Sequence, residues 1–117
     1  MKIKEMVSLL QAEVLTCEEN LESEVHSACG SDMMSDVLAF VKDQAVLLTG
    51  LVNAQVIRTA DMMDMRCIVF VRNKKPTEEM LSLAKESGIV VLASPLRMYE
   101  ACGTLYMEGL RSSRSAK

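Results

Sequence analysis

The sequence predicts an α/β fold: a single compact domain in which a mostly parallel sheet of about five strands carries helices on both faces. Three apolar runs, at residues 45–50, 66–71 and 89–94, carry this prediction, because strands buried on both faces have this composition. Segments with helical periodicity separate the runs, and strands that alternate with helices favour a parallel sheet. A length of 117 residues is typical of one domain, expected over 1–110, with a flexible polar tail at 111–117.

The segment before the first apolar run predicts a helix and two further strands. Residues 2–13 have helical periodicity, and the apolar face of this helix holds Met6, Val7 and Leu10. Short strands are expected at 14–17 and 24–29, with an acidic, solvated turn between them. These two strands bring the expected total to five.

A second helix is expected after Gly30. Its apolar residues recur at i, i+3, i+4 and i+7, and they are Met34, Val37, Leu38 and Val41. Ser31 or Asp32 is suited to cap this helix, because a side-chain oxygen there accepts from a free N–H group of the first turn. The alternative is a strand at 37–41.

Each later helix follows one of the apolar runs. Asn53 is placed to cap a helix whose buried face holds Val56, Ile57, Ala60 and Met63. The next helix begins near Thr77 and ends at Gly88, since glycine favours the left-handed conformation that closes a helix. The last helix has its apolar face at Met98, Ala101, Cys102 and Leu105.

Composition and charge argue against several classes of protein. The net charge is −3, without a basic stripe, which argues against nucleic-acid binding. No apolar run approaches the roughly 18 residues of a membrane span. The four cysteines lack the close pairs that zinc sites use. Without a signal-peptide pattern, we expect a reduced, cytoplasmic protein with no metal or cofactor, whose ten methionines mainly fill the core.

The candidate ligand site lies at the carboxyl ends of the strands, where open α/β sheets bind ligands. Its centre is the Thr49-Gly50 pair, because glycine lets a ligand approach the backbone and the next helix points free N–H groups there. The phosphate-loop pattern and G-x-G-x-x-G are absent, so a plain strand-to-helix turn is the alternative. The residues expected to contact a ligand are Gly30, Ser31, Asp32, Thr49, Gly50, Asn53, Gln55 and Arg58.

No set of residues in the sequence meets the requirements of a catalytic site. His26 is the only histidine, and we interpret it as a partly buried structural residue. Asp32 and Asp36 lie four positions apart, on one face of the expected helix. Paired carboxylates can bind Mg²⁺, but a helix cap and a surface acid are the preferred interpretation. No catalytic residue and no metal ligand are therefore assigned.

The stretch ACGSDMMSDVLAFVKDQAVLLTG, followed by NAQVIRTADMMDMRCIVFVRNKKPTEE, resembles the DRTGG domain family, in particular its small stand-alone bacterial members. The resemblance covers residues 1–110 and depends on the order of elements, the run S-D-x-x-S-D-V-L-A-F and the strand–Thr-Gly–helix junction. It implies a compact α/β domain with a regulatory or assembly role, in which dimerisation recurs. Such domains occur in CBS-containing pyrophosphatases, in phosphate acetyltransferases and in the N-terminal part of HPr kinase/phosphorylase, where a neighbouring domain performs the chemistry.

The chain departs from the residues that give this family its name. Members usually follow the glycine of the central strand with Asp-Arg, and they end the next strand in Thr-Gly-Gly. The corresponding positions here hold Leu51-Val52 and Val71-Arg72-Asn73. An acid, a guanidinium and two glycines are thus missing from the edge where a ligand would bind. This difference favours an interaction module or a different ligand.

The sequence therefore favours a non-catalytic regulatory domain that acts as a homodimer and senses a small anionic metabolite or nucleotide. The dimer contact is expected on an apolar helix face or strand edge that the small core leaves uncovered. The alternative is an adaptor that docks onto a partner enzyme encoded nearby and binds no small molecule. A small hydrolase or transferase is the least favoured of the three.

Overall fold

A computed structural model describes residues 1–40 and 44–112, and its centre is a five-stranded sheet with the order β1-β5-β4-β3-β2. Strands β2 to β5 run parallel, and β1 pairs with β5 in the antiparallel direction. The predicted α/β class with a mostly parallel sheet is confirmed. The strands are β1 (Glu13–Val14), β2 (Ser27–Gly30), β3 (Ala45–Thr49), β4 (Cys67–Phe70) and β5 (Val90–Ala93).

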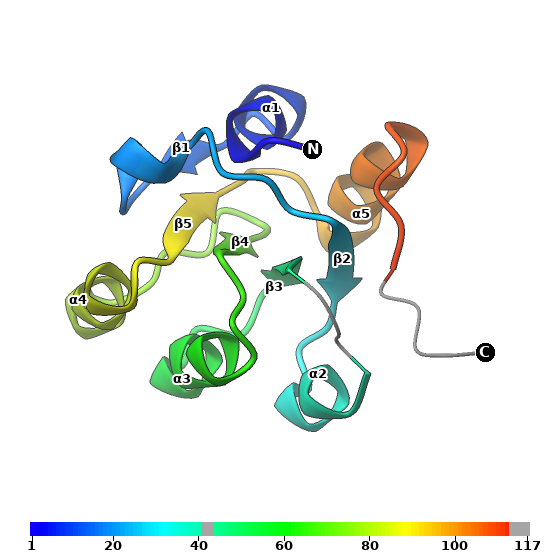
Figure 1. The fold of residues 1–117 in the computed structure, drawn as a ribbon. Helices are drawn as coiled ribbons and strands as arrows, with labels where there is room; N and C mark the ends of the chain where they lie inside the picture. Colours follow the sequence, from blue (N-terminus) through cyan, green and yellow to red (C-terminus); the bar gives the residue numbers. More distant parts are fainter. Residues whose placement is uncertain (41–43, 113–117) are drawn as a thin grey trace.

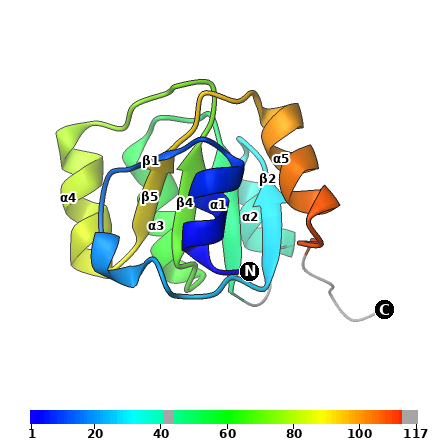
Figure 2. The same cartoon turned by 90° about the horizontal axis from the view of Figure 1, so that it is seen from above.

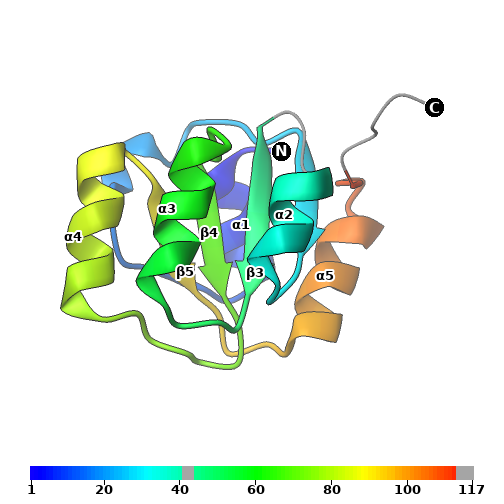
Figure 3. The same ribbon diagram turned by 90° about the horizontal axis from the view of Figure 1, so that it is seen from below.

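The helices cover both faces of this sheet, as predicted. The strands β2 to β5 step across the sheet in one direction, and crossovers of one handedness then place their helices on one face. Figures 1 and 3 show α2, α3 and α4 together on that face. Figure 2 shows α1 and α5 on the other. The helices are α1 (Ile3–Leu9), the 3₁₀ helix η1 (Glu18–Asn20), α2 (Met34–Phe40), α3 (Ala54–Met62), α4 (Glu78–Ser87) and α5 (Met98–Met107).

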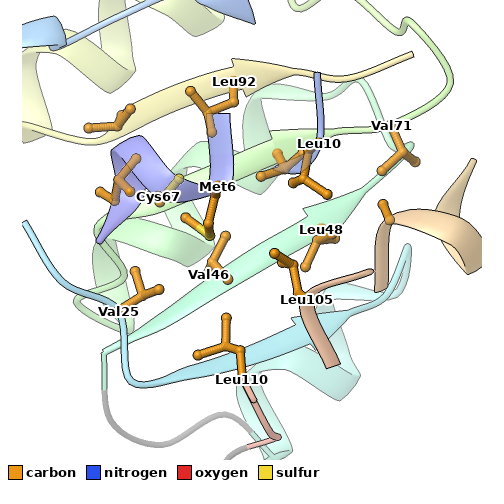
Figure 4. Close-up of a cluster of buried hydrophobic side chains, with 14 residues drawn as sticks. Met6, Leu10, Val25, Val46, Leu48, Cys67, Val71, Leu92, Leu105 and Leu110 are labelled. Atoms are coloured by element: carbon orange, nitrogen blue, oxygen red, sulfur yellow. The ribbon is translucent and has the colours of Figure 1, made fainter. Parts of the chain in front are cut away.

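The core consists of two clusters of buried side chains, one on each face of the sheet. Every residue of β3, β4 and β5 is buried, as expected for the three apolar runs. Successive side chains of a strand point to opposite faces. Val46 and Leu48 pack with Met6 and Leu105 in the cluster beneath α1 and α5 (Figure 4), and Leu47 belongs to the cluster beneath α2, α3 and α4.

The caps predicted at Asn53 for α3 and at Gly88 for α4 are confirmed, and Thr77, predicted as the start of α4, caps that helix. Asn53 Oδ1 accepts a hydrogen bond of 2.7 Å from the backbone nitrogen of Gln55, which fixes the first turn of α3. Thr77 Oγ1 accepts one of 3.2 Å from the backbone nitrogen of Met80 at the start of α4. Gly88 ends α4 with φ of 72°, in the left-handed region where glycine is favoured.

The strand predicted at 14–17 is shorter than expected, because the Thr16 side chain replaces the backbone after Leu15, whose nitrogen still donates to the carbonyl oxygen of Val91 (2.8 Å). Thr16 Oγ1 donates to the carbonyl oxygen of Ile89 (2.7 Å) and accepts from the backbone nitrogen of Val91 (2.9 Å). Cys17 then turns the chain with φ of 54°. The contact with β5 continues, although the strand has ended.

Four further expectations are corrected. The strand predicted at 24–29 begins only at Ser27, and the alternative strand at 37–41 is wrong, because α2 occupies that segment up to the boundary of the described residues. Val41, which completes the predicted helix face, lies outside them. His26 is exposed instead of partly buried. The methionines are divided: Met6, Met65 and Met80 are buried, and Met33, Met62 and Met107 are exposed.

The last described residues lie beside the edge strand β2. Leu110 is 6% exposed and belongs to the core, and the carbonyl oxygen of Arg111 accepts from the backbone nitrogen of Ala28 (2.9 Å). Residues 113–117, most of the predicted tail, lie outside the described part of the chain. Within residues 1–40 and 44–112, no helix has the length and apolar character needed to cross a membrane.

Candidate functional site

The loops that follow the parallel strands meet at one edge of the sheet, and backbone hydrogen bonds hold two of them together. The backbone nitrogen of Arg72, after β4, donates to the carbonyl oxygen of Leu96 at 2.8 Å. The next nitrogen, of Asn73, donates to the carbonyl oxygen of Ser94 at 2.9 Å. The loop after β4 is therefore anchored to the loop that leads from β5 to α5.

Asp32 joins the loop after β2 to the end of β3. Its Oδ1 atom accepts hydrogen bonds from the Thr49 hydroxyl (2.9 Å) and from the backbone nitrogen of Gly50 (2.7 Å). The Thr49 oxygen in turn accepts from the backbone nitrogen of Leu51 at 3.1 Å. Thr49 is completely buried, whereas Asp32 is exposed. Three of the predicted site residues thus form one hydrogen-bonded corner, defined by Asp32, Thr49 and Gly50.

The guanidinium of Arg72 covers Gly50 in this corner. A Cβ atom added to Gly50 would lie only 2.6 Å from Nη2 of Arg72, so the absence of a side chain is what allows this close approach. Arg72 and Asn73 have φ values of 58° and 57°, in the left-handed region. This conformation costs a residue other than glycine roughly 1–3 kcal/mol. The backbone is strained at the point where it presents the guanidinium.

Arg72, and not Arg58, is therefore the cation of the corner. Arg58 is exposed just over one turn into α3, so the helix carries it away from Gly50. Arg72 is not among the residues predicted from the sequence to contact a ligand. Its position in the sequence could have predicted this role. Arg72 directly follows the apolar run of β4, and parallel strands such as β3 and β4 end at the same edge of the sheet.

The remaining predicted residues are not all directed to the corner. Ser31 shapes the turn before α2, where its hydroxyl accepts from the backbone nitrogen of Met33 (2.9 Å). Gly30 faces α5, since a Cβ there would lie 2.6 Å from the sulfur of Cys102. The pairing of Asp32 with Asp36 on one helix face is wrong, because Asp32 precedes α2 and bonds to β3. Asn53 and Gln55 lie at the amino end of α3.

The comparisons with known proteins identify the family of this fold. The family model described as the DRTGG domain matches residues 5–106. The chain belongs to the DRTGG domain family. A comparison with curated protein sequences gives no match.

A solved structure has the same fold as this DRTGG domain. It is the crystal structure of the CBS and DRTGG domains of the regulatory region of a Clostridium perfringens pyrophosphatase, in complex with the activator diadenosine tetraphosphate. The TM-score is 0.71 at 16% sequence identity, and the match covers 89% of this chain and 45% of that chain. At this identity the likeness shows the fold alone. The DRTGG domain described here spans less than half the length of that region.

The left-handed pair at Arg72 and Asn73 occupies the positions that the family resemblance assigns to Gly-Gly. The φ values of 58° and 57° are those that glycine adopts most readily, so the turn has a conformation suited to glycine although its residues differ. Leu51-Val52 stands where family members usually have Asp-Arg, which implied that this edge had lost a guanidinium. Arg72 supplies a guanidinium at the same edge. Asp32 supplies an acid at the same place.

The charged groups at this edge are suited to binding a ligand. His26 precedes β2, and the six positions that separate it from Asp32 correspond to about 20 Å of extended chain. Burial raises the pKa of the Cys29 thiol, with a further contribution from Cys102, so this thiol is protonated near neutral pH. Among residues 1–40 and 44–112, no group of three or more His, Cys, Asp and Glu could hold a metal ion. A carboxylate and a guanidinium at one backbone turn are suited to hold a polar, anionic molecule.

Proposed function

We propose that this DRTGG domain is a non-catalytic regulatory module that acts as a homodimer and binds a nucleotide or a similar anionic metabolite. The binding site is the corner of Asp32, Thr49 and Gly50, together with Arg72, whose guanidinium covers Gly50. The observation that carries the proposal is the arrangement at Gly50, where a carboxylate holds the backbone nitrogen and a guanidinium covers the α-carbon.

A nucleotide has the chemistry that this pair of charges recognises. Asp32 accepts from Thr49 and Gly50 through Oδ1, and its side chain is exposed, so Oδ2 is available to accept from a ribose hydroxyl. Arg72 is exposed and carries the planar donor group that pairs with phosphate oxygens. The amino end of α3, which begins beside the corner, adds partial positive charge. Together these groups favour a ligand with both hydroxyls and phosphates.

The similar pyrophosphatase region supports a regulatory role and a nucleotide ligand. Its DRTGG domain belongs to a regulatory region, which was crystallised with the activator diadenosine tetraphosphate. Extending a nucleotide ligand to this chain is part of the proposal. In this proposal, a catalytic partner encoded nearby receives the signal. The four cysteines are all free, which fits the reducing environment of the cytoplasm, where we place the protein.

A thermal-shift screen tests the proposal directly. The probes are AMP, ATP, diadenosine tetraphosphate, acetyl phosphate and coenzyme A, each titrated into the purified chain. A ligand that binds only the folded state adds about 2.7 kcal/mol at 100 times its dissociation constant, which raises the melting temperature by several degrees in a domain of this size. We expect saturable stabilisation by a nucleotide, confirmed by calorimetry. The absence of any shift at millimolar probe concentrations would contradict the sensor and favour an adaptor without a small-molecule ligand.

A further inference from the structure

The outer side of α5 is apolar and exposed. Tyr99 is 86% exposed, Met107 83% and Tyr106 57%, although surface helices usually turn polar residues outward. These three side chains line a shallow groove of about 620 Å³. Ala101 and Leu105, on the opposite side of the same helix, are buried in the core. Apart from Glu100 and Thr104, which also line the groove, the helix is thus apolar on both sides, which is typical of a helix that is covered on both.

Gly103 lies at the centre of this outer side. A Cβ atom there would meet no atom of the described residues within 4 Å, and φ of Gly103 is not positive. Glycine in the middle of a helix is less favourable than alanine. The described part of the protomer therefore gives no reason for glycine at this position. Close approach by a second backbone does give one, since it requires a residue without a side chain.

We propose that two copies of this chain associate through α5, packed antiparallel across a two-fold axis at Gly103. This inference rests on the homodimer of the proposed function and adds its contact surface. Such an interface is self-complementary, because the same patch is used by both copies. An α-helix turns by about 100° per residue, so Tyr99 and Tyr106 lie at about −40° and −60° around the helix axis, measured from Gly103. Both rings are therefore on the same flank of Gly103. The axis therefore places Tyr99 against the partner's Tyr106, twice.

Contacts with Arg111 hold the Tyr106 side chain in place before any association. The guanidinium of Arg111 lies 3.9 Å from the centre of the Tyr106 ring, and Nη1 of Arg111 donates to the carbonyl oxygen of Tyr106. A ring that is held in place before binding loses less conformational freedom on association. Figure 1 shows α5 at one end of the molecule, where its outer side is turned away from the sheet.

The exposed area matches a reversible dimer. A fully covered tyrosine buries about 150–250 Å², so four tyrosines, two methionines and their neighbours amount to roughly 1,000 Å² across the pair. Specific interfaces begin near this size. We therefore expect a dissociation constant in the micromolar range.

Sedimentation analysis between about 1 and 200 μM tests the interface, since this range spans micromolar dissociation constants. We expect a monomer–dimer equilibrium for the wild type, and at least a tenfold increase in the dissociation constant for Gly103→Gln and for Tyr99→Ser. Ser82→Gln, at an exposed position of α4, is the matched control and is expected to leave the equilibrium unchanged. A Cβ atom at position 103 meets no atom of the described protomer within 4 Å, so Gly103→Gln is expected to fold; circular dichroism separates loss of the dimer from misfolding.

A cross-link tests the position of the axis. In a Cys102→Ser background, Gly103→Cys is expected to give disulfide-linked dimers on mild oxidation, because the axis brings both introduced thiols together; Ser82→Cys in the same background is the control. Absence of this cross-link overturns the antiparallel geometry. A wild type that stays monomeric at 200 μM overturns the homodimer as well as the interface. A dimer that Gly103→Gln and Tyr99→Ser leave intact overturns the α5 interface alone, and the proposed homodimer then uses another surface.

Discussion

Oδ1 of Asp32 lies 2.7 Å from the backbone nitrogen of Gly50, a residue 18 positions later in the chain. The same oxygen accepts from the buried hydroxyl of Thr49 at 2.9 Å. One acid thus satisfies two donors at the end of β3 and fixes the loop after β2 against it. The shape of the candidate site depends on this contact.

Asp32→Ala is expected to lower the free energy of unfolding by about 1–2 kcal/mol, because the Thr49 hydroxyl and the Gly50 nitrogen both lose their acceptor. Urea denaturation at pH 7 measures the change. Asp36→Ala is the matched control: Asp36 is an exposed acid in the first turn of α2, and its loss is expected to cost roughly 0.5 kcal/mol or less. Equal effects of the two substitutions would show that the corner does not depend on Asp32.

Thr16→Val is expected to destabilise the fold by about 1–3 kcal/mol, because it leaves the Ile89 carbonyl and the Val91 nitrogen of a buried segment without partners. Valine has nearly the same shape, so packing is preserved. Thr104→Val is the control, since that hydroxyl donates only to the exposed carbonyl of Glu100 on the surface of α5. Thermal or urea denaturation compares the two. A Thr16→Val protein as stable as the wild type would contradict the role assigned to this hydroxyl.

The strands and helices were predictable because their signals are local. β3, β4 and β5 are buried on both faces, and each therefore appears in the sequence as an uninterrupted apolar run. Asn53 and Gly88 mark helix ends through single residues whose effect is confined to one turn. The edge strand β1 was less predictable, because the Thr16 side chain replaces the backbone there and no pattern in the chain signals such a replacement.

The candidate site was predicted only in part, because its contacts join loops that are distant in the sequence. Thr49 and Gly50 follow from a local strand-to-helix junction. The partners of that junction, Asp32 and Arg72, depend on which strands flank β3, and strand order is not a local property. Arg58 is closer to Gly50 in the sequence, but α3 carries it away from the corner.

Arg72→Gly is expected to raise the free energy of unfolding by about 0.5 kcal/mol, because glycine adopts the left-handed conformation at this position without steric cost. Lys74→Gly, in the same loop but without a positive φ, is expected to lower it by roughly 0.5–1 kcal/mol, since there glycine only adds freedom to the unfolded chain. Urea denaturation of both variants measures whether each substitution raises or lowers the free energy of unfolding. Destabilisation by both substitutions would show that the Arg72 side chain contributes more to the fold than its backbone strain removes.

Stability is expected to fall at alkaline pH. Burial raises the pKa of the Cys67 thiol well above its ordinary value of 9.0, so the thiol stays protonated in the folded state, while it ionises in the unfolded state. The contribution of the protonated Cys67 thiol to the free energy of unfolding is therefore fully present below about pH 8. It is lost as the pH rises, by up to about 1.4 kcal/mol per pH unit. Urea denaturation at about pH 7.5 and pH 10 measures the decrease. Cys67→Ala is expected to show a smaller decrease in the free energy of unfolding between these two pH values. A decrease as large as that of the wild type would contradict the assignment of the effect to Cys67.

Arg72→Gln is expected to weaken binding of the nucleotide found in the ligand screen by about tenfold or more, because a hydrogen bond to a charged group contributes about 1.5–3 kcal/mol. Arg58→Gln removes the same charge from an exposed position of α3 and is expected to change the affinity less than about threefold, since long-range attraction between exposed charges is weak at physiological salt. Calorimetry on both variants separates contact with the guanidinium from overall charge. Equal losses would indicate that overall positive charge, and not contact with the Arg72 guanidinium, governs the affinity, and no loss in either variant would remove the ligand from this edge of the sheet. A larger loss of affinity in Arg72→Gln than in Arg58→Gln would therefore show that the left-handed turn after β4 places the Arg72 guanidinium in contact with the ligand.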